Sequence, residues 1–269
     1  MPTILTWNMQ GGQGNNESKW QNLSGCVQNP AHCGLTNRPA VICLQECSDV
    51  PNMDVGIAGW GGGPGGNVTV GSKNFGTYNN PLCFFVAHYL WGNANNRVSF
   101  AILIHTVNNP APPPAHKQYA NDLSAHVAVL GPVALPGTQP VIGVTLNLAA
   151  LGAPALLVSY YSMHAPSGVS VNASRAYVND MITAAGGGGP GWPNHYIIGG
   201  DFNCEPADLH TIANPIPNGA LFHTGLPTCG DKNYDYFTAD NQIAAQTVLN
   251  NVSRIPNLMS DHIAVAADY

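Results

Sequence analysis

Apolar runs of four to eight residues recur along the chain, and most are rich in β-branched or aromatic side chains. Runs of this length, separated by Gly, Pro, Asn and Asp, are typical of buried β-strands. We predict nine strands, at residues 3–7, 40–44, 82–87, 98–104, 141–148, 155–161, 195–198, 234–238 and 263–267.

Two segments instead favour helices over residues 18–27 and 171–185; the second clearly repeats its apolar positions at the 3.6-residue helical spacing. Strands outnumber helices, the two kinds alternate irregularly, and no linker or internal repeat divides the sequence. The pattern predicts a single domain, residues 1–269, of the α/β (α+β) class, with two packed sheets and helices outside them.

Composition narrows the classes of protein that remain. The chain has 269 residues, of which 45% are hydrophobic, so it can bury a substantial core. Only 8% are charged, against roughly 25% in an average soluble domain, and the net charge is −6. This excludes a basic nucleic-acid coat. No apolar run approaches the roughly 20 residues of a membrane helix, so we expect no integral membrane segment.

The seven cysteines leave two interpretations open. One is an exported protein with one to three disulfides, in which Cys26 and Cys33 close a local loop. The other is a set of buried free thiols. The sequence opens directly into a predicted strand, without a basic start and an apolar signal segment. We expect a secreted protein whose leader is absent from this sequence.

Six ionisable side chains and one asparagine lie where predicted strands begin or end. Among only 14 Asp and Glu residues, Glu46 directly follows residues 41–45, and Asp201 directly follows residues 196–200. Side chains at strand ends can meet at one rim of a sandwich, where the strands hold them rigidly. The residues placed this way are Asn8, Glu46, His164, Asp201, Asp235, Asp261 and His262.

Each of these residues alone also has a structural interpretation. Asn8 can form a turn, Asp201 can begin an Asx turn, and the segment with Asp261 can cap a helix. A single histidine such as His164 is more often structural than catalytic, and Glu46 can be a solvated loop acid. Their common order along the chain favours a shared site.

That order resembles the successive motifs of the endonuclease/exonuclease/phosphatase superfamily, whose familiar member is deoxyribonuclease I. The motifs are TWNMQG at 6–11, LQE at 44–46, YSMHA at 161–165, GDFN at 200–203, DY at 235–236 and SDH at 260–262. Within this superfamily the chain is most similar to the catalytic B subunits of cytolethal distending toxins. That similarity rests on WNMQG at 7–11, NRVSFAIL at 96–103, HA at 164–165 and GDFN followed by Pro206.

The resemblance implies a four-layer sandwich of two packed mixed β-sheets flanked by helices. It also implies a Mg²⁺-dependent phosphodiesterase that cleaves DNA. Such cleavage needs a cation, a base for the attacking water and help for the leaving oxygen. By the family pattern, Mg²⁺ or Mn²⁺ is held by Glu46, Asp261 and Asn8, whose hard oxygen atoms suit these ions.

The same pattern assigns roles to the remaining residues. His262 accepts the proton of the attacking water, and Asp235 stabilises the imidazolium that forms. His164 donates to the phosphate or the leaving group.

Substrate contacts are implied at four further positions. Asp201 and Asn203 position the nucleophile and a phosphate oxygen, and Asn8 lies beside them. Arg97 is the candidate phosphate clamp, because its planar guanidinium can make two contacts. An ordinary surface arginine is the alternative.

The chain departs from the toxin pattern in two respects. Where the toxins carry arginines, after the GDFN loop and in the strand before His164, it has CE at 204–205 and QPVIGVT at 139–145. No acid between Asp54 and Asp122 is an evident counterpart of the residue that pairs with the first histidine of deoxyribonuclease I. We therefore expect a carbonyl or an amide to orient His164, and its protonated form to be less favoured.

The scarcity of cations bears on the substrate. The logarithm of the affinity for DNA falls by about 0.9 per phosphate contact for each tenfold rise in salt concentration. Four contacts therefore give a slope of log affinity against log salt of only about −4. We expect a weak nuclease when the protein acts alone, with lectin-like delivery subunits as possible partners and the host nucleus as a possible destination. The dispersed cations are Lys19, Arg38, Lys73, Arg97, Lys117, Arg175, Lys232 and Arg254.

Two other functions fit the same residues. One is a phosphatase acting on phosphoinositides or another small phosphoester, which the few basic residues favour. The other is a catalytically impaired binding subunit that keeps the fold, which the missing arginines allow.

Overall fold

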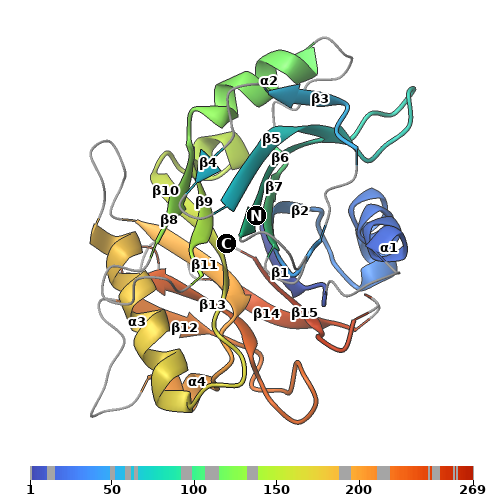
Figure 1. Ribbon diagram of the computed structural model, residues 1–269. Helices are drawn as coiled ribbons and strands as arrows, with labels where there is room; N and C mark the ends of the chain where they lie inside the picture. Colours follow the sequence, from blue (N-terminus) through green and yellow to red (C-terminus); the bar gives the residue numbers. More distant parts are fainter. Residues whose placement is uncertain are drawn as a thin grey trace.

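Two β-sheets face each other at the centre of the molecule, with helices on the outside (Figure 1). The computed structural model describes residues 2–10, 16–48, 52–57, 62–63, 66–91, 99–106, 115–131, 139–187, 195–210, 219–241, 243, 249–256, 258 and 260–268. Among these residues, no helix is both long and apolar enough to cross a membrane.

The first sheet has nine strands in the order β14-β15-β1-β2-β7-β6-β5-β3, with β4 paired to β5. It is mixed, because β1 and β2 are parallel and the other pairs are antiparallel. The strands are β1 Thr3–Asn8, β2 Pro39–Gln45, β3 Val55–Ile57, β4 Gly62–Gly63, β5 Gly66–Asn74, β6 Cys83–Trp91, β7 Ser99–Ile104, β14 Asn250–Ile255 and β15 Ala264–Asp268.

The second sheet has six strands in the order β12-β13-β11-β10-β9-β8. Here β10 and β11 are the parallel pair, and the other neighbours are antiparallel. The strands are β8 Val127–Leu130, β9 Val141–Asn147, β10 Leu157–His164, β11 Tyr196–Asp201, β12 Gly219–Phe222 and β13 Asp235–Asp240.

Helices cover the outer faces of both sheets. Trp20 and Leu23 of α1 join an apolar cluster on the nine-stranded sheet, and Tyr177 and Met181 of α3 join another on the six-stranded sheet. The layers therefore run helix, sheet, sheet, helix, and the predicted four-layer sandwich is confirmed. The helical elements are α1 Asn16–Gln28, η1 Pro30–Cys33, α2 Ala115–Ser124, η2 Leu148–Leu151, α3 Val171–Gly187 and α4 Pro206–Leu209.

The continuous apolar runs arise because the central strands are buried on both faces. In β2, Val41 and Cys43 face the cluster between the sheets, while Ile42 and Leu44 face the cluster under α1. Successive side chains of a strand point to opposite faces, so a strand buried on both faces must be apolar at every position.

All nine predicted strands and both predicted helices are confirmed, with boundaries shifted by a few residues. The prediction missed β3, β4, β5, β8, β12 and β14 and, among the helical elements, α2, α4, η1 and η2. Strand β5 is interrupted by Gly, Ser and Asn and has alternating exposed positions in its first half, so it lacks a continuous apolar run.

The parallel pairs bring four chain segments to one end of the sandwich. Asn8 at the end of β1 pairs with Gln45 of β2, and His164 at the end of β10 pairs with Asp201 of β11. Asp201 in turn pairs with Asp235, the first residue of β13. The strand-terminal residues therefore lie at the same rim of the two sheets.

Close packing holds the sheets together beneath this rim. Gln45 Nε2 donates to Ser162 Oγ at 2.9 Å across the interface, and Ser162 Oγ donates to the Leu44 carbonyl at 2.7 Å. A Cβ on Gly199 would lie 2.9 Å from a ring atom of Phe237 and 3.1 Å from Cβ of Thr6 in the opposite sheet. Glycine is therefore needed where β11 of one sheet lies against β1 of the other.

All seven cysteines are free thiols, and six of them are buried. The expected disulfides, including one between Cys26 and Cys33, are therefore absent, and the alternative of buried thiols describes the structure.

Candidate active site

His262 and Asp235 form the tightest pair at the rim. His262 Nδ1 lies 2.9 Å from Asp235 Oδ2, and the Asp235 side chain is fully buried. Thr228 Oγ1 accepts hydrogen bonds from the main-chain N–H groups of Tyr234 and Asp235, which fixes the start of β13. This arrangement orients the imidazole and leaves its Nε2 directed away from Asp235.

Asp201 connects this pair to the opposite sheet. Its Oδ2 lies 3.7 Å from His262 Nε2 and accepts a hydrogen bond of 3.0 Å from Asn8 Nδ2. The same oxygen lies 3.5 Å from His164 Nε2. Asp201 is therefore the one described carboxylate in contact with both histidines.

Glu46 completes the group from the end of β2. Its Oε1 lies 3.5 Å from His164 Nε2 and 3.4 Å from Asn8 Nδ2. Glu46 and Asp201 thus approach the same imidazole nitrogen, and Asn8 donates to both carboxylates. The structure brings together Asn8, Glu46, His164, Asp201, Asp235 and His262 in one continuous set of contacts.

Asp261 joins the set through neighbouring polar groups. Its Oδ2 accepts a hydrogen bond of 2.7 Å from Gln10 Nε2, and Ser260 Oγ donates to the Asn8 carbonyl at 2.9 Å. Lys19 donates to the carbonyls of Met9 and Gln10. The charges of Asp261 and Glu46 both favour the Lys19 ammonium, although burial is the larger effect and lowers the pKa of Lys19.

Asn203 lies beside Asp201 and is held by two hydrogen bonds. Its main-chain N–H donates to Asp201 Oδ1 at 2.9 Å, and its Nδ2 donates to the Ala165 carbonyl at 2.7 Å. The second bond links the loop after β11 to the loop after β10. Asn203 therefore braces the rim, and its Oδ1 is the atom left for a substrate contact.

The loops of the site adopt a backbone conformation that is uncommon for side-chain-bearing residues. Gln10, Glu46, Ser48 and Asn203 all have φ between 46° and 53°. Asn tolerates this region, whereas Glu rarely occupies it, and such residues cost about 1–3 kcal/mol each. Left-handed residues concentrated at one rim are typical of a functional site.

The surroundings shift the pKa values of the two histidines in opposite directions. Burial disfavours the charged form of His262, but its hydrogen bond to Asp235 and the charges of Asp235, Asp201 and Asp261 outweigh burial and raise its pKa to about 9. Burial lowers the pKa of His164, against the opposing charge of Glu46. At neutral pH His262 holds a proton and His164 is neutral, which agrees with the expectation that protonated His164 is less favoured.

The expected orientation of His164 is wrong for the described residues. We expected a carbonyl or an amide to hold its second nitrogen, but the buried Nδ1 has no hydrogen-bond partner among them. His164 is instead positioned by Glu46 and Asp201 at Nε2. Burying a ring nitrogen without a hydrogen-bond partner costs free energy. The surrounding fold must therefore hold the His164 ring in this position.

The donor chemistry of the rim suits a divalent cation. Burial raises the pKa of Asp201 and raises that of Asp235 to about 6, so two fully buried carboxylates lack sufficient positive compensation. Glu46, Asp261 and the oxygen of Asn8 add hard ligands, although Asn8 Oδ1 already accepts from Gln10 N–H at 2.8 Å.

Two clusters of described Cys, His, Asp and Glu side chains have ligand atoms within 4.8 Å of one another. One is Asp201, Asp235 and His262, and the other is Cys229, Asp261 and His262. Both include His262, and neither includes Glu46.

Some sequence expectations cannot be placed, and some contacts were not foreseen. Arg97 lies outside the described residues. Lys19, Thr228 and Cys229 border the site, yet each lies outside the motifs that identified it. Gln10 and Ser260 did fall within quoted motifs, but their contacts become evident only from the folded arrangement.

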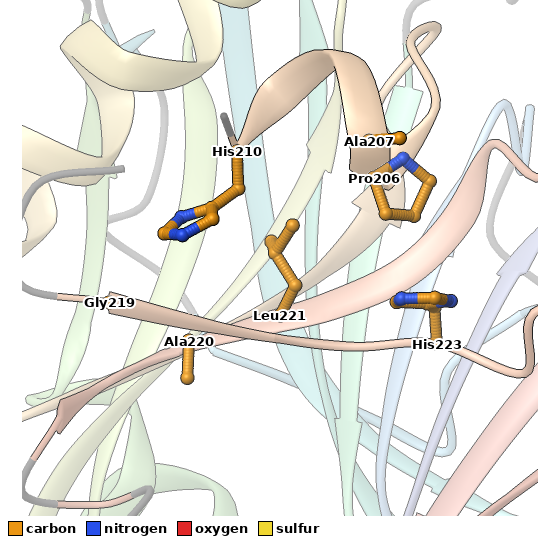
Figure 2. A pocket seen from close by; sticks show the side chains of 7 residues that line it. All are labelled: Pro206, Ala207, His210, Gly219, Ala220, Leu221 and His223. Carbon is orange, nitrogen blue, oxygen red and sulfur yellow. The ribbon is translucent and has the colours of Figure 1, made fainter. Parts of the chain in front are cut away.

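A separate hollow of about 480 Å³ lies under α4, beside β12 (Figure 2). His210 and His223 flank Leu221 in this hollow. Leu221 packs with the cluster under α3, whereas the next residue, Phe222, packs between the sheets. The hollow therefore opens on the outer face of the six-stranded sheet and includes none of the rim residues described above.

Two facing mixed β-sheets between outer helices form the four-layer sandwich of the deoxyribonuclease I-like fold. No family model and no curated protein sequence matches the chain. Solved structures do match it. The cytolethal distending toxin of Haemophilus ducreyi has a TM-score of 0.69 at 17% identity, over 98% of this chain and 96% of that chain.

Two further structures show the same similarity. CdtB, described as the biologically active subunit of cytolethal distending toxin, has a TM-score of 0.67 at 20% identity, over 99% of this chain and 96% of that chain. TDP2 of D. rerio, complexed with single strand DNA product, has a TM-score of 0.57 at 10% identity, over 99% and 97%. The resemblance drawn from the motifs is thus confirmed at the level of the fold.

Proposed function

We propose that this protein is a divalent-metal-dependent phosphodiesterase that cleaves DNA, of the kind represented by the B subunit of cytolethal distending toxins. The observation that carries the proposal is the continuous contact from Asp235 through His262 and Asp201 to His164. It joins a hydrogen-bonded base to a second, neutral histidine across one oxygen atom. Phosphodiester cleavage needs a base for the attacking water on one side of the phosphate and a hydrogen-bond donor on the other.

His262 is the base in this proposal. Its Nε2 accepts the proton of the attacking water, while Asp235 holds Nδ1 and stabilises the charged ring. Because its pKa is raised to about 9, His262 must first lose the proton that it carries at neutral pH. Cleavage should therefore accelerate as the pH rises toward 9.

His164 is the hydrogen-bond donor on the other side. A lowered pKa keeps its ring neutral, so it offers one N–H and carries no charge. Asp201 and Asn203 position the water and a phosphate oxygen. Arg97 remains the predicted phosphate clamp.

Glu46, Asp261 and Asn8 are the residues that would hold Mg²⁺ or Mn²⁺. When bound, the ion neutralises the charge that develops on the phosphate. Asp201 and Asp235, whose buried charges lack compensation in the protein alone, would be stabilised by the same ion.

The biological setting belongs to the same proposal. We infer a single domain, residues 1–269, that is secreted and acts with lectin-like delivery subunits, with the host nucleus as the destination. Support comes from the similarity to toxin structures over nearly the whole chain. A DNA substrate is supported by the TDP2 structure that holds a DNA product.

A phosphoinositide or other small-phosphoester phosphatase is the second candidate. It is favoured by the few cations, 8 Lys and Arg in 269 residues, since duplex binding depends on phosphate neutralisation. A binding subunit that has lost turnover is the third.

Parallel assays separate the three candidates. The protein, with Mg²⁺ or Mn²⁺ and with chelator as the control, is given supercoiled plasmid in one assay and phosphoinositide vesicles in another. We expect metal-dependent nicking of plasmid and no phosphate release. Phosphate release without nicking would indicate the phosphatase. If the protein shows neither nicking nor phosphate release, the result would indicate the binding subunit.

A further inference from the structure

A thiol lies against the rim at a place where the proposed reaction has no use for it. Cys229 forms an isolated antiparallel bridge with His262, and Ile263 N–H donates to the carbonyl of the preceding Thr228 at 2.7 Å. Residues opposed in this way carry their side chains on the same face. Ligand atoms of Cys229, Asp261 and His262 accordingly all lie within 4.8 Å of one another.

A tight turn fixes the position of this thiol. Cys229 N–H donates to the Lys232 carbonyl at 3.0 Å, and Lys232 N–H donates to the Cys229 carbonyl at 2.9 Å. Gly230, inside the turn, has φ +57°, a conformation that glycine adopts without strain. Cys229 is also the one cysteine of the seven that is not buried, so an ion from solvent can reach it.

The three ligands differ in kind from the oxygen set of Glu46, Asp261 and Asn8. Sulfur, imidazole nitrogen and carboxylate oxygen are the ligands of zinc, whereas Mg²⁺ prefers oxygen alone. His262 is also prepared as a zinc ligand. Its Nδ1 is held by Asp235 at 2.9 Å, and zinc-binding histidines almost always pair their second nitrogen with such an acceptor.

We propose that Cys229, Asp261 and His262 form a binding site for Zn²⁺, and that Zn²⁺ bound there switches the reaction centre off. The ion takes three protein ligands, and water completes a tetrahedral set. Inhibition rests on the proposed phosphodiesterase function, whereas binding does not.

The exchange of protons explains the inhibition. Zn²⁺ replaces the thiol proton of Cys229 and any proton on His262 Nε2, and both protons pass to solvent. The lone pair of Nε2 is then shared with the ion, so it cannot accept the proton of water. Because Asp261 then binds Zn²⁺, it is no longer available as an oxygen ligand for Mg²⁺.

Binding is tested with Co²⁺, which occupies zinc sites and gives a sulfur-to-metal charge-transfer band when a thiolate is a ligand. We expect one equivalent of Co²⁺ to produce this band in protein freed of metal, and Zn²⁺ to remove it. Cys229→Ser should abolish the band, and the matched control Cys33→Ser, which alters a buried thiol on η1, should retain it. A band that survives in Cys229→Ser, or no band in the wild type, overturns the site.

Inhibition is tested by titrating Zn²⁺ into plasmid nicking at saturating Mg²⁺, with each variant compared with its own rate without zinc. Outer-shell partners alone change metal affinity by about 10–100-fold, so loss of a direct ligand should raise the half-inhibiting Zn²⁺ concentration of Cys229→Ser by at least about tenfold. Equal sensitivity of Cys229→Ser and Cys33→Ser overturns the switch.

A third readout does not depend on catalysis. In ¹⁵N-labelled protein, Zn²⁺ should shift the Nε2 resonance of His262 and leave that of His223, in the separate hollow, unchanged (Figure 2). An unshifted His262 contradicts capture of the base. Absence of nicking with a shifted His262 would reject the proposed function while retaining the zinc site.

Discussion

The two histidines of the rim are both buried and both contact Asp201, yet their pKa values are shifted in opposite directions. His262 has a buried carboxylate 2.9 Å from Nδ1, and its pKa is raised to about 9. His164 has two carboxylates at 3.5 Å from Nε2 and no described partner at Nδ1, and burial lowers its pKa. At His262 the hydrogen bond to Asp235 and the charges of Asp235, Asp201 and Asp261 together outweigh burial, whereas at His164 burial prevails over the charge of Glu46. The sandwich therefore places a basic and a neutral imidazole on either side of Asp201.

Removing the basic ring should have the largest effect. We expect His262→Ala to lower the rate of plasmid nicking by about 10²–10⁴-fold, the range for loss of a general base. Initial rates at saturating Mg²⁺ measure it. His223→Ala, which removes an exposed histidine from the hollow of Figure 2, is the control and should keep the wild-type rate. Equal rates for the two variants would remove His262 from the mechanism.

Removing the neutral ring should have a somewhat smaller effect. His164→Ala is expected to lower the nicking rate by about 10²–10³-fold, as for the loss of one donor to a developing anion. Because the base is untouched, the dependence of the remaining rate on pH should keep the wild-type shape. A flattened profile measured from pH 6 to 10 would show that His164, and not His262, is the titrating group.

Glu46, the carboxylate beside His164, should act through the metal ion. Glu46→Gln keeps the shape of the side chain but removes one charge from the oxygen set. We expect the half-saturating Mg²⁺ concentration to rise about 10–100-fold, with much of the rate recovered at high Mg²⁺. A Mg²⁺ titration of nicking decides this. An unchanged half-saturation point would place the ion elsewhere.

The carboxylate beside His262 should act through pH. Asp235→Asn removes the negative charge that raises the pKa of His262 and leaves at most a neutral amide oxygen as acceptor, so the inflection of the pH–rate profile should move down from about 9 toward the ordinary histidine value of about 6.5. A raised pKa means more proton bound at a given pH, so wild-type activity increases with pH up to the inflection. An inflection that stays in place would assign the titration to another group.

Much of this arrangement could be predicted from the sequence, because strands that are buried on both faces have continuous apolar sequences. In β1, β2, β10 and β11 both faces are covered, and the residue at which each run stops is the residue at the rim. The motif order along the chain supplied the rest of the site. Strands such as β5 and β12, which lie at or near sheet edges, carried too few consecutive apolar residues to be recognised.

The details of the site depend on register and therefore escaped prediction. Cys229 meets His262 only through a bridge between two loops, and Lys19 reaches the rim from α1. The cysteine count suggested disulfides, but all seven cysteines are free thiols and six of them are buried. Contacts of this kind are decided by tertiary packing, on which local sequence patterns carry no information.

Whether the two imidazoles serve one chemical step is measured most directly by metal-activated nicking of supercoiled plasmid with His164→Ala, His262→Ala and the double variant. Residues that act as a unit are strongly non-additive. The double variant should therefore cleave about as slowly as the slower single variant, and all three should lie far below the wild type. A wild-type rate no higher than those of the variants, or losses that simply multiply in the double variant, would contradict a shared reaction centre.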